Sequence, residues 1–487
     1  MKALFVISGL VIIGLSILAV GTLSEARTDV PVMYWTTDSN PARARQIATF
    51  EKWMKEHGYG EVVLKLDTNN QGVMKVIIQS ASGVGSELID LYGATQLRQC
   101  VAAGVLKDVT DQARQYGFDL SRTYPGAADE LTVAGRQYAF PCNVTTEVVT
   151  INQAILDREP DLPRPKFEWT WDEFLTWCKA VRKVDSRGNV TRYAIWPNWG
   201  FTAREIWPTN GGSIFNETMT RCTLDSPAVL EATKFYYDLM FVHKVMPTPT
   251  DILAQSAQAG YGDVALHTLG NGLSVSVPIG RYGLIQLRKF KDFRPDVALI
   301  PYKVAPMQFI FARATGVNAG ARDPNLAARF LQYLASEAYN RLIIDDGDAL
   351  PPDPAMASEP EFLRPSAYPG EHDTNAHAKY ALAAKQYGVG RECSDFILPS
   401  VVNRIVEENL QGIANQVLSP EDGLRRMTDE INVEIQRAVE RDPKLQPAYR
   451  EACRLQEEID RLKAAGKPVP PERIANPVLR RLRELGK

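Results

Sequence analysis

The segment from Trp199 to Ser213 carries residue types that bind sugars. It reads Trp-Gly-Phe-Thr-Ala-Arg-Glu-Ile-Trp-Pro-Thr-Asn-Gly-Gly-Ser, with tryptophans at 199 and 207 beside an Asn-Gly-Gly turn. An indole ring offers a rigid apolar plane to the C–H face of a sugar, and glycine lets backbone amides approach a ligand closely. Two tryptophans packed in a core would give the same pattern, and buried aromatic residues are the commoner case. The segment therefore predicts either a sugar-binding loop or a core aromatic cluster.

Polar side chains and another tryptophan follow the first predicted strand. This strand covers residues 30 to 35, ends at Trp35, and is followed by Asp38 and Asn40. In α/β sheets, ligands bind beyond the carboxyl ends of the strands. Carboxylate and amide groups form hydrogen bonds to vicinal hydroxyls, and an indole ring can stack on a sugar. We therefore expect Trp35, Asp38 and Asn40 to face a ligand.

Patterns that indicate an enzyme or a metal site are absent from the sequence. His57 and His243 lie in predicted helices, and His372 and His377 lie in a polar loop without a third ligand at a useful spacing. The sequence contains no Gly-x-Ser-x-Gly elbow and no phosphate-binding Gly-x-x-x-x-Gly-Lys-Ser/Thr loop. We expect four surface histidines, no metal, no cofactor and no catalysis.

The elements that position the strand-end residues form a βαβ unit. Apolar residues recur at helical spacing from Arg43 to His57, and Gly58 ends this predicted helix. Residues 62 to 66 then alternate as a second strand. A strand, a helix and a further strand in this order predict the opening of a doubly wound α/β lobe.

A second helix start is predicted at Thr170-Trp-Asp-Glu173. A hydroxyl followed three residues later by a carboxylate has the form of a capping box, in which each side chain bonds the other residue's backbone amide. Apolar residues follow on one face of the predicted helix. We expect Trp171 and Trp177 to lie in the core.

Length and composition indicate a globular protein with more than one lobe. The chain has 487 residues, more than one ordinary hydrophobic core accommodates, and its 45% hydrophobic and 23% charged residues are typical of globular proteins. The net charge of -3 gives no reason to expect nucleic-acid binding, which requires strongly basic surfaces.

The N-terminal segment has the pattern of an export signal. Lys2 precedes an uncharged apolar run from residue 3 to residue 23, and Ser24-Glu-Ala26 fits a small-x-small cleavage site. The run is also as long as a bilayer-spanning helix, so an uncleaved anchor stays open. We expect residues 1–26 to be a signal peptide or an N-terminal anchor of an exported protein.

The six cysteines do not predict a specific pairing. They are widely separated in the sequence, and no short-spaced pair suggests a metal site or a redox motif. An oxidising compartment permits disulfides, and buried free thiols are the equal alternative.

Several segments together resemble extracellular solute-binding proteins of ABC transporters, in the maltose-binding-like carbohydrate group (family 1). Asn210-Gly-Gly, followed by Leu224-Asp-Ser-Pro227, is similar to the family's "NGG … LDSP" segment. Further similar segments occur in family order, and these are residues 79–92, 104–111, 135–141 with 151–152, 316–319 and 323–336. The familiar "G-x-W" segment is replaced by Gly270-Asn271-Gly272-Leu273.

The resemblance implies a two-lobed periplasmic-binding-protein-like fold of type II, with two doubly wound α/β lobes joined by a multi-segment hinge. The first lobe would hold residues 27–143 and 296–345, and the second would hold residues 152–290 and 350–435. Residues 436–487 lie beyond the family's usual end and have helical spacing at Leu455, Ile459 and Leu462. We expect this charged extension to lie on the second lobe, and a contact with the transporter or with anionic lipid is the alternative.

The resemblance also implies a function and a binding site. The protein would be exported to the periplasm or cell surface and would deliver a sugar or oligosaccharide to ABC permease subunits by closing its cleft, as a monomer. From residue type and position in this fold, we expect the ligand-binding residues to be Trp35, Asp38, Asn40, Asn143, Thr145, Glu147, Trp199, Trp207, Asn210, Gly211, Asn271 and Arg313.

Three alternatives to a neutral sugar importer stay open. Arg313 would bind a phosphorylated polyol or a uronate through bidentate hydrogen bonds. A membrane-anchored sensor module would retain the N-terminal helix and have a receptor in place of a permease. An exported carbohydrate-active enzyme would need two positioned carboxylates in the cleft.

Overall fold

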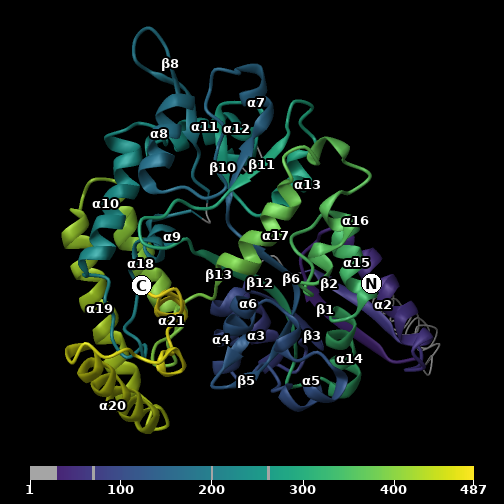
Figure 1. Cartoon of the computed structure of the whole chain (residues 1–487). Coiled ribbons are helices and arrows are strands. Elements are labelled where there is room, and N and C mark those ends of the chain that lie inside the picture. Colours follow the sequence, from purple (N-terminus) through teal and green to yellow (C-terminus); the bar gives the residue numbers. More distant parts are fainter. Residues whose placement is uncertain (1–29, 69–71, 199–200, 260–263) are drawn as a thin grey trace, which may run out of the picture.

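The computed structural model describes residues 30–68, 72–198, 201–259 and 264–487. Two β-sheets organise the chain into two lobes, which Figure 1 shows at the lower right and at the top. The first sheet has the strand order β13 (Gly388–Val389), β12 (Gln308–Val317), β3 (Leu88–Tyr92), β1 (Val32–Thr37) and β2 (Val63–Thr68), and β6 (Ala139–Thr146) also pairs with β12. The second sheet has the order β11 (Pro295–Ala298), β7 (Val149–Asn152), β10 (Ser274–Pro278), β9 (Val190–Ile195) and β8 (Lys183–Val184).

The first lobe begins with the expected βαβ unit. Strand β1 runs parallel to both β2 and β3, so their carboxyl ends share one edge of the sheet. Strand β12 is antiparallel to β3 and β6. The helices of this lobe are α2 (Ala42–Glu56), α3 (Val73–Ala81), α4 (Gly93–Ala102), α5 (Thr110–Tyr116), α6 (Pro125–Leu131), α14 (Pro324–Leu334) and α15 (Glu337–Asp346), with a small hairpin of β4 (Thr132–Val133) and β5 (Arg136–Gln137).

The second lobe contains the predicted capping box. Thr170 accepts from the Glu173 amide, and the Glu173 carboxylate accepts from the Thr170 amide, so the helix start is confirmed. Trp171 stacks on Phe235 with ring centroids 4.3 Å apart, and Trp177 is also buried, as expected. The helices of this lobe are α7 (Gln153–Arg158), α8 (Trp171–Val181), α9 (Ala203–Ile206), α10 (Pro227–Phe241), α11 (Pro249–Ala259), α12 (Val264–Gly270), α13 (Leu284–Leu287), α18 (Pro399–Ala414) and α19 (Pro420–Arg441).

Three chain segments join the lobes, which agrees with the expected multi-segment hinge. They connect β6 to β7, β11 to β12, and β13 to α18. The expected start of a first-lobe segment at residue 296 is corrected by the pairing, because β11 continues the second sheet through β7. The short α16 (Pro360–Leu363) and α17 (Ala376–Tyr387) lie between the sheets, and α17 packs on β6, β11, β12 and β13.

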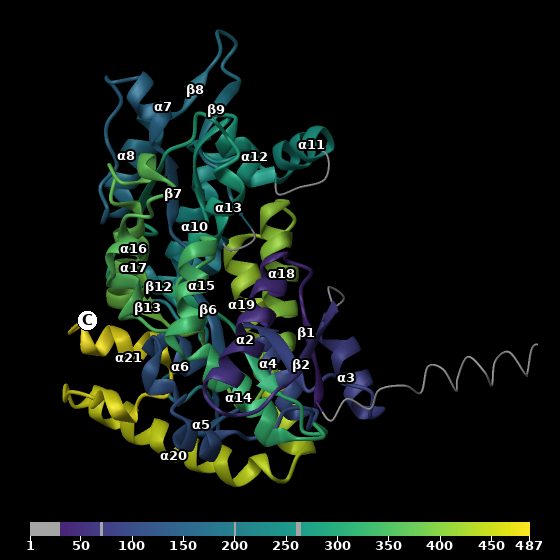
Figure 2. The ribbon, with the colours of Figure 1, turned by 90° about the vertical axis from the view of Figure 1, so that its right-hand side faces the viewer.

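The C-terminal extension forms two further helices, α20 (Leu445–Ala464) and α21 (Pro477–Glu484). Helix α20 packs against α19 of the second lobe, and the predicted face of Leu455, Ile459 and Leu462 forms a small apolar cluster with residues that precede and start α21. Figure 2 shows α20 and α21 along the lower left edge of the molecule. Among the described residues, no helix combines the length and the apolar character needed to span a bilayer. The predicted signal segment lies outside the described residues.

Candidate functional site

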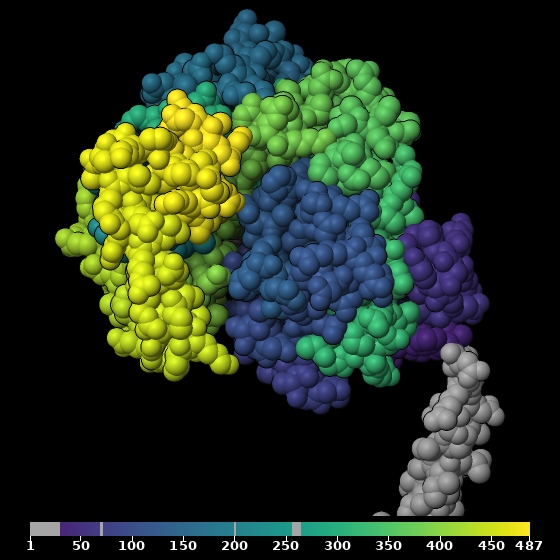
Figure 3. Space-filling view, turned by 60° about the horizontal axis from the view of Figure 1, so that its bottom comes forward, coloured from purple at the N-terminus to yellow at the C-terminus, as the bar shows by residue number. Residues whose placement is uncertain are grey.

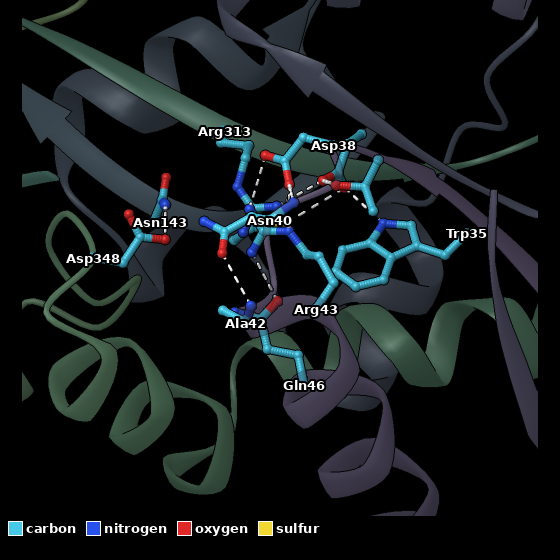
Figure 4. A network of polar contacts seen from close by, with 12 residues as sticks. Trp35, Asp38, Asn40, Ala42, Arg43, Gln46, Asn143, Arg313 and Asp348 are labelled. Carbon is cyan, nitrogen blue, oxygen red and sulfur yellow. Dashed lines mark hydrogen bonds and ion pairs between the residues drawn. The ribbon is translucent and has the colours of Figure 1, made fainter. Parts of the chain in front are cut away.

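A buried polar network connects the end of β1 with β3 and β12, and we call it the strand-end network. Asp90 at its centre accepts hydrogen bonds from Arg313 Nη1 at 2.7 Å and from Trp35 Nε1 at 2.8 Å. The hydroxyls of Thr37 and Thr315 also donate to the Asp90 carboxylate. Figure 4 shows Trp35 and Arg313 in one group of polar contacts with Asp38 and Arg43. Both side chains are buried, and their polar atoms Trp35 Nε1 and Arg313 Nη1 are bonded to Asp90.

Asp38 belongs to the same network and orients a residue of the cleft. Arg43 binds Asp38 through two hydrogen bonds of 3.0 Å, and the Tyr92 hydroxyl donates to Asp38 at 2.9 Å. Burial opposes ionisation of Asp38, but the hydrogen bonds and charge of Arg43 outweigh it and lower the Asp38 pKa to about 2. Asn40 accepts a hydrogen bond from the Ala42 amide at the start of α2. Asp38 and Asn40 thus make contacts within the protein and are only partly buried.

The second-lobe candidates are packed inside the protein. Trp207 is 1% exposed, and its indole donates to Thr233 Oγ1 at 2.9 Å. Asn210 donates to the Ala228 carbonyl and to Glu231, and Gly211 adopts a positive φ of 80° in the turn. The structure therefore corrects the platform interpretation of Trp207 in favour of the core alternative. Trp199 lies outside the described residues.

The remaining candidates lie at the hinge or on the surface. Asn143 donates to Asp348 Oδ2 at 2.9 Å. Thr145 lies near the end of β6, and Glu147 lies in the segment that joins β6 to β7. Asn271 is exposed after α12 and lines none of the cavities described below. Among the candidates that the structure describes, Glu147 lies in a joining segment, and Asn143 and Thr145 lie in the strand that leads into it.

A cavity of about 230 Å³, which we call the cleft cavity, lies between the lobes. Its first-lobe wall contains Tyr92, Gly93, Ala94, Thr95, Glu130 and Phe311, and its other wall contains Arg204, Arg391, Glu392, Cys393, Pro399, Val402, Asn403 and Glu407. Two neighbouring cavities extend it, one of about 240 Å³ that shares Tyr92 and one of about 290 Å³ that shares Arg204, Arg391 and Glu407. Known ligand pockets occupy roughly 300–1,000 Å³, so the three cavities together match a ligand site better than any one does.

Two arginines of the cleft cavity have unused hydrogen-bond donors. Arg204 Nη1 donates to Asn403 at 2.7 Å, and Arg204 Nε has no partner. Arg391 donates to Glu205 at 3.0 Å and lies over the Phe311 ring at 4.2 Å, and its Nε also has no partner. Burial, reinforced by the nearby charge of Arg391, lowers the Arg204 pKa to about 10. Both arginines can therefore donate hydrogen bonds to an oxygen-rich ligand.

Two buried glutamates lie near these arginines. Glu130 Oε2 accepts from the Ala312 amide at 3.1 Å, and Glu147 Oε1 accepts from the Tyr282 hydroxyl at 3.1 Å. The second carboxyl oxygen of each has no partner. Burial raises the pKa of Glu130 to about 7 and the pKa of Glu147 to about 8. A protonated carboxyl group both donates and accepts hydrogen bonds, as a hydroxyl ligand requires.

The two lobes contact each other across the cleft. Asn403 Nδ2 of α18 donates to Thr95 Oγ1 of α4 at 3.1 Å, and Arg98 of α4 forms an ion pair with Asp395. Helices α4 and α18 pack together at this position. We call this arrangement closed because residues of both lobes meet at the rim of the cavity.

The structure contains no metal centre within the described residues, where no group of three or more histidine, cysteine or acidic side chains is close enough to hold an ion. The six cysteines are all free thiols. His377 corrects the expectation of a surface histidine, because it is fully buried in α17 between Arg281 and Glu371. Burial lowers its pKa to about 4, so it is neutral at physiological pH.

Sequence reasoning missed most residues of the cleft cavity. Tyr92 is the last residue of the family-like segment 79–92, and Arg204 lies between Trp199 and Trp207. Glu130, Arg391 and Asn403 lie in no recognised motif. No local pattern marks them, because the cavity forms only when the two lobes meet.

A family model described as "Bacterial extracellular solute-binding protein" matches residues 38–341. Solved structures share the fold at low sequence identity. An ABC substrate-binding protein from Listeria monocytogenes in complex with cycloalternan is 20% identical, with a TM-score of 0.69 over 84% of this chain and 99% of that chain. Maltose-bound MalE3 of T. maritima is 15% identical, with a TM-score of 0.65 over 83% and 100% of the two chains. UgpB from Mycobacterium tuberculosis in complex with glycerophosphocholine is 16% identical, with a TM-score of 0.66 over 84% and 99%.

Proposed function

The chain belongs to the bacterial extracellular solute-binding protein family, and from this premise we propose that it is the exported binding component of an ABC importer for a sugar or oligosaccharide. Similar structures hold cycloalternan, maltose and maltotetraose, which supports a carbohydrate. The ligand would bind between the lobes and be delivered to permease subunits when the cleft opens at the membrane. The protein would act as a monomer and without catalysis.

The single observation that carries this proposal is the row of three cavities around Tyr92 and Arg204. Guanidinium, carboxyl and amide groups from both lobes line it, together with the rings of Tyr92, Phe311, Tyr236 and Tyr237. Vicinal hydroxyls suit such paired donors and acceptors, and aromatic rings suit the C–H face of a sugar. Groups from both lobes can contact one ligand together only when the lobes meet, so the ligand would favour closure by its higher affinity for the closed state.

An acidic sugar or a phosphorylated polyol is the second candidate ligand. The observation that favours it is the unpartnered Nε of both Arg204 and Arg391 in one cavity. Arginine forms bidentate hydrogen bonds with carboxylates and phosphates. The neighbouring Glu205 partly neutralises Arg391, which is why a neutral sugar stays the first candidate.

Thermal unfolding with a ligand panel tests the proposal. The panel contains maltose, maltotriose, cycloalternan, glucuronate and glycerol phosphate, each at millimolar concentration. A ligand bound only by the folded state at a hundred times its Kd stabilises the fold by about 2.7 kcal/mol, which raises the melting temperature measurably. A shift with the saccharides supports a sugar importer, and a shift with glucuronate or glycerol phosphate alone supports the second candidate. An unchanged melting temperature with every compound, and hydrolysis of any saccharide during incubation, would each count against the proposal.

Export and membrane anchoring have a separate test. We propose that residues 1–26 are removed, because Ser24-Glu-Ala26 follows the uncharged run. Mass spectrometry of the protein from the cell envelope should find an N-terminus near Arg27. An intact N-terminus in the membrane fraction would support the anchored alternative.

A further inference from the structure

Beyond α19, the C-terminal extension lies against the loop that follows the Asn210-Gly-Gly turn, where it contacts residues between 213 and 218. Gln456 of α20 donates to Glu217 at 2.8 Å, and Lys463 forms an ion pair with the same carboxylate. The ring of Tyr449 packs on Phe396 with centroids 5.1 Å apart. The extension is therefore fixed to the second lobe through α20.

Asn476, directly before α21, is more deeply buried than the α20 residues that contact the second lobe. Its side chain is fully buried and its Nδ2 lies 2.8 Å from Glu392 Oε1 and 2.9 Å from the Phe215 carbonyl. Its Oδ1 accepts from the Val478 amide at 3.0 Å and so caps α21. Since Glu392 lines the cleft cavity, Asn476 connects the start of α21 to the cavity wall.

Helix α21 then crosses to the first lobe. Val478 and Leu482 pack in an apolar cluster with Met307, Phe309 and Val389. Met307 lies in the segment that joins β11 to β12, and Phe309 and Val389 lie in β12 and β13 of the first sheet. Arg480 forms an ion pair with Asp129 of α6 at 2.7 Å. Figure 3 shows the extension, in yellow, beside the first lobe, in blue.

Both anchor points of α21 are next to residues of the cleft cavity. One anchor, Glu392, lines the cavity itself and follows Arg391, which also lines it. The other anchor, Asp129, does not line the cavity but directly precedes Glu130, which does. The contact between Arg480 and Asp129 forms in the same arrangement in which Asn403 touches Thr95 across the cleft. A contact made in one arrangement and lost in another shifts the population toward the first.

We propose that Asn476 and Arg480 are positioning residues of the cleft, and that they make α21 a strap which stabilises the closed arrangement of the lobes. Asn476 holds the wall formed by Arg391 and Glu392, and Arg480 holds α6 with Glu130. The consequence for ligand capture rests on the proposed function. The bias toward closure is a property of the protein without ligand.

Interlobe distances in the ligand-free full-length protein test the strap. Nitroxide amino acids at the exposed positions Arg114 in the first lobe and Arg187 in the second avoid the six native cysteines. Pulsed electron paramagnetic resonance then compares the wild type with Arg480→Ala, Asp129→Ala and the double variant. Each single variant should raise the ratio of open to closed molecules by up to about fivefold, the upper range for a partly exposed pair. The double variant should equal either single variant, because all three lack the same contact.

Arg473→Ala is the matched control. Arg473 pairs with Glu458 at 3.2 Å, and both residues lie within the extension, so its distance distribution should equal that of the wild type. Unchanged or shorter distances in both Arg480→Ala and Asp129→Ala would overturn the strap, and so would an equal effect of Arg473→Ala. Because no ligand is present, that outcome leaves the proposed function unaffected, and a panel without binding leaves the strap measurement valid.

Asn476→Ala tests the second anchor. It removes the amide that contacts Glu392 and should open the lobes at least as much as Arg480→Ala. Circular dichroism verifies that this variant is folded before its distances are compared. A folded Asn476→Ala protein with the wild-type distribution would contradict the positioning role of Asn476, and an unfolded one leaves the decision to the Arg480 series.

Discussion

The strand-end network and the cleft cavity both contain buried charged groups, but the network pairs both of its arginines, whereas of the two cavity arginines only Arg391 has a carboxylate partner. Arg313 has Asp90 at 2.7 Å, and Arg43 has Asp38 at 3.0 Å. In the cleft cavity, no carboxylate forms an ion pair with Arg204, as far as the described chain shows. Among the described residues, no ion pair forms with the carboxyl group of Glu130, which lines the cavity, or with that of Glu147 in the nearby joining segment.

This difference separates groups that maintain the fold from groups available to a ligand. A buried charge without a partner is costly, and the cost appears as a lowered pKa for Arg204 and raised pKa values for Glu130 and Glu147. Such perturbed groups in a cleft are typical of functional sites. We therefore propose that the cleft cavity binds the ligand and that the strand-end network maintains the fold, with Thr37 and Asp90 also lining the neighbouring cavity of about 240 Å³.

Removing the centre of the strand-end network should have the largest effect. Asp90→Ala leaves Arg313 buried without its carboxylate, and breaking a buried ion pair in this way costs about 3–5 kcal/mol. Urea unfolding measures the loss. The control is Asp111→Ala, whose ion pair with Arg114 is exposed and should change stability by less than about 0.5 kcal/mol. Equal stability of the two variants would break the comparison.

Glu147, a buried acid of the segment that joins β6 to β7, should instead make the stability of the protein depend on pH. Burial raises its folded-state pKa to about 8, above its ordinary value of 4.5. The folded protein therefore keeps a proton that the unfolded chain releases, so this contribution to stability is complete below pH 4.5 and is lost as pH rises to 8. Glu147→Gln should become more stable than the wild type by at least about 2 kcal/mol at pH 8, since each pKa unit corresponds to about 1.4 kcal/mol. Parallel stability curves of variant and wild type between pH 5 and pH 8 would show that Glu147 is not buried as a neutral acid.

Arg204 should matter for binding and not for stability. Arg204→Gln removes a charged donor and should weaken binding of the saccharide that gives the largest thermal shift by about 1.5–3 kcal/mol. Its unfolding free energy should stay equal or rise, because an unpaired buried charge is removed. Arg404→Gln, on the exposed side of α18, is the control and should bind normally. Calorimetry that finds unchanged affinity for Arg204→Gln would remove Arg204 from the site.

The smallest effect is expected for Trp207, which belongs with the packed residues. Trp207→Phe keeps most of the ring volume and leaves Thr233 Oγ1 without its indole donor, at a cost of about 1–2 kcal/mol. Saccharide affinity should be unchanged. A stable variant with weakened binding would restore the stacking interpretation of Trp207.

The sequence predicted the parts of the fold that depend on local patterns. The βαβ opening, the capping box at Thr170 and the core positions of Trp171 and Trp177 all follow from spacing within about fifteen residues, and the structure confirms them. The two-lobed family fold is also confirmed, because the motifs occur along most of the chain. Strand β11 was assigned to the wrong lobe because its partner β7 is far away in the sequence.

The residues of the candidate site could not be predicted from such local sequence patterns. A tryptophan beside a glycine turn has the same sequence whether its ring packs on Thr233 or faces a ligand, so only the fold distinguishes the two. Arg204 and Arg391 meet across nearly two hundred residues, and the cavity they share needs contacts between the lobes. The role of Asn476 likewise depends on Glu392, which no spacing rule connects to the extension.

A crystal structure with the saccharide that raises the melting temperature most tests the central claim directly. We expect ligand density in the cleft cavity, with hydrogen bonds to Arg204 and contact with Tyr92. Asp90 should keep Arg313 and Trp35 as partners. Density that displaces Arg313 from Asp90, or that lies outside the three cavities, would contradict the assignment of the site.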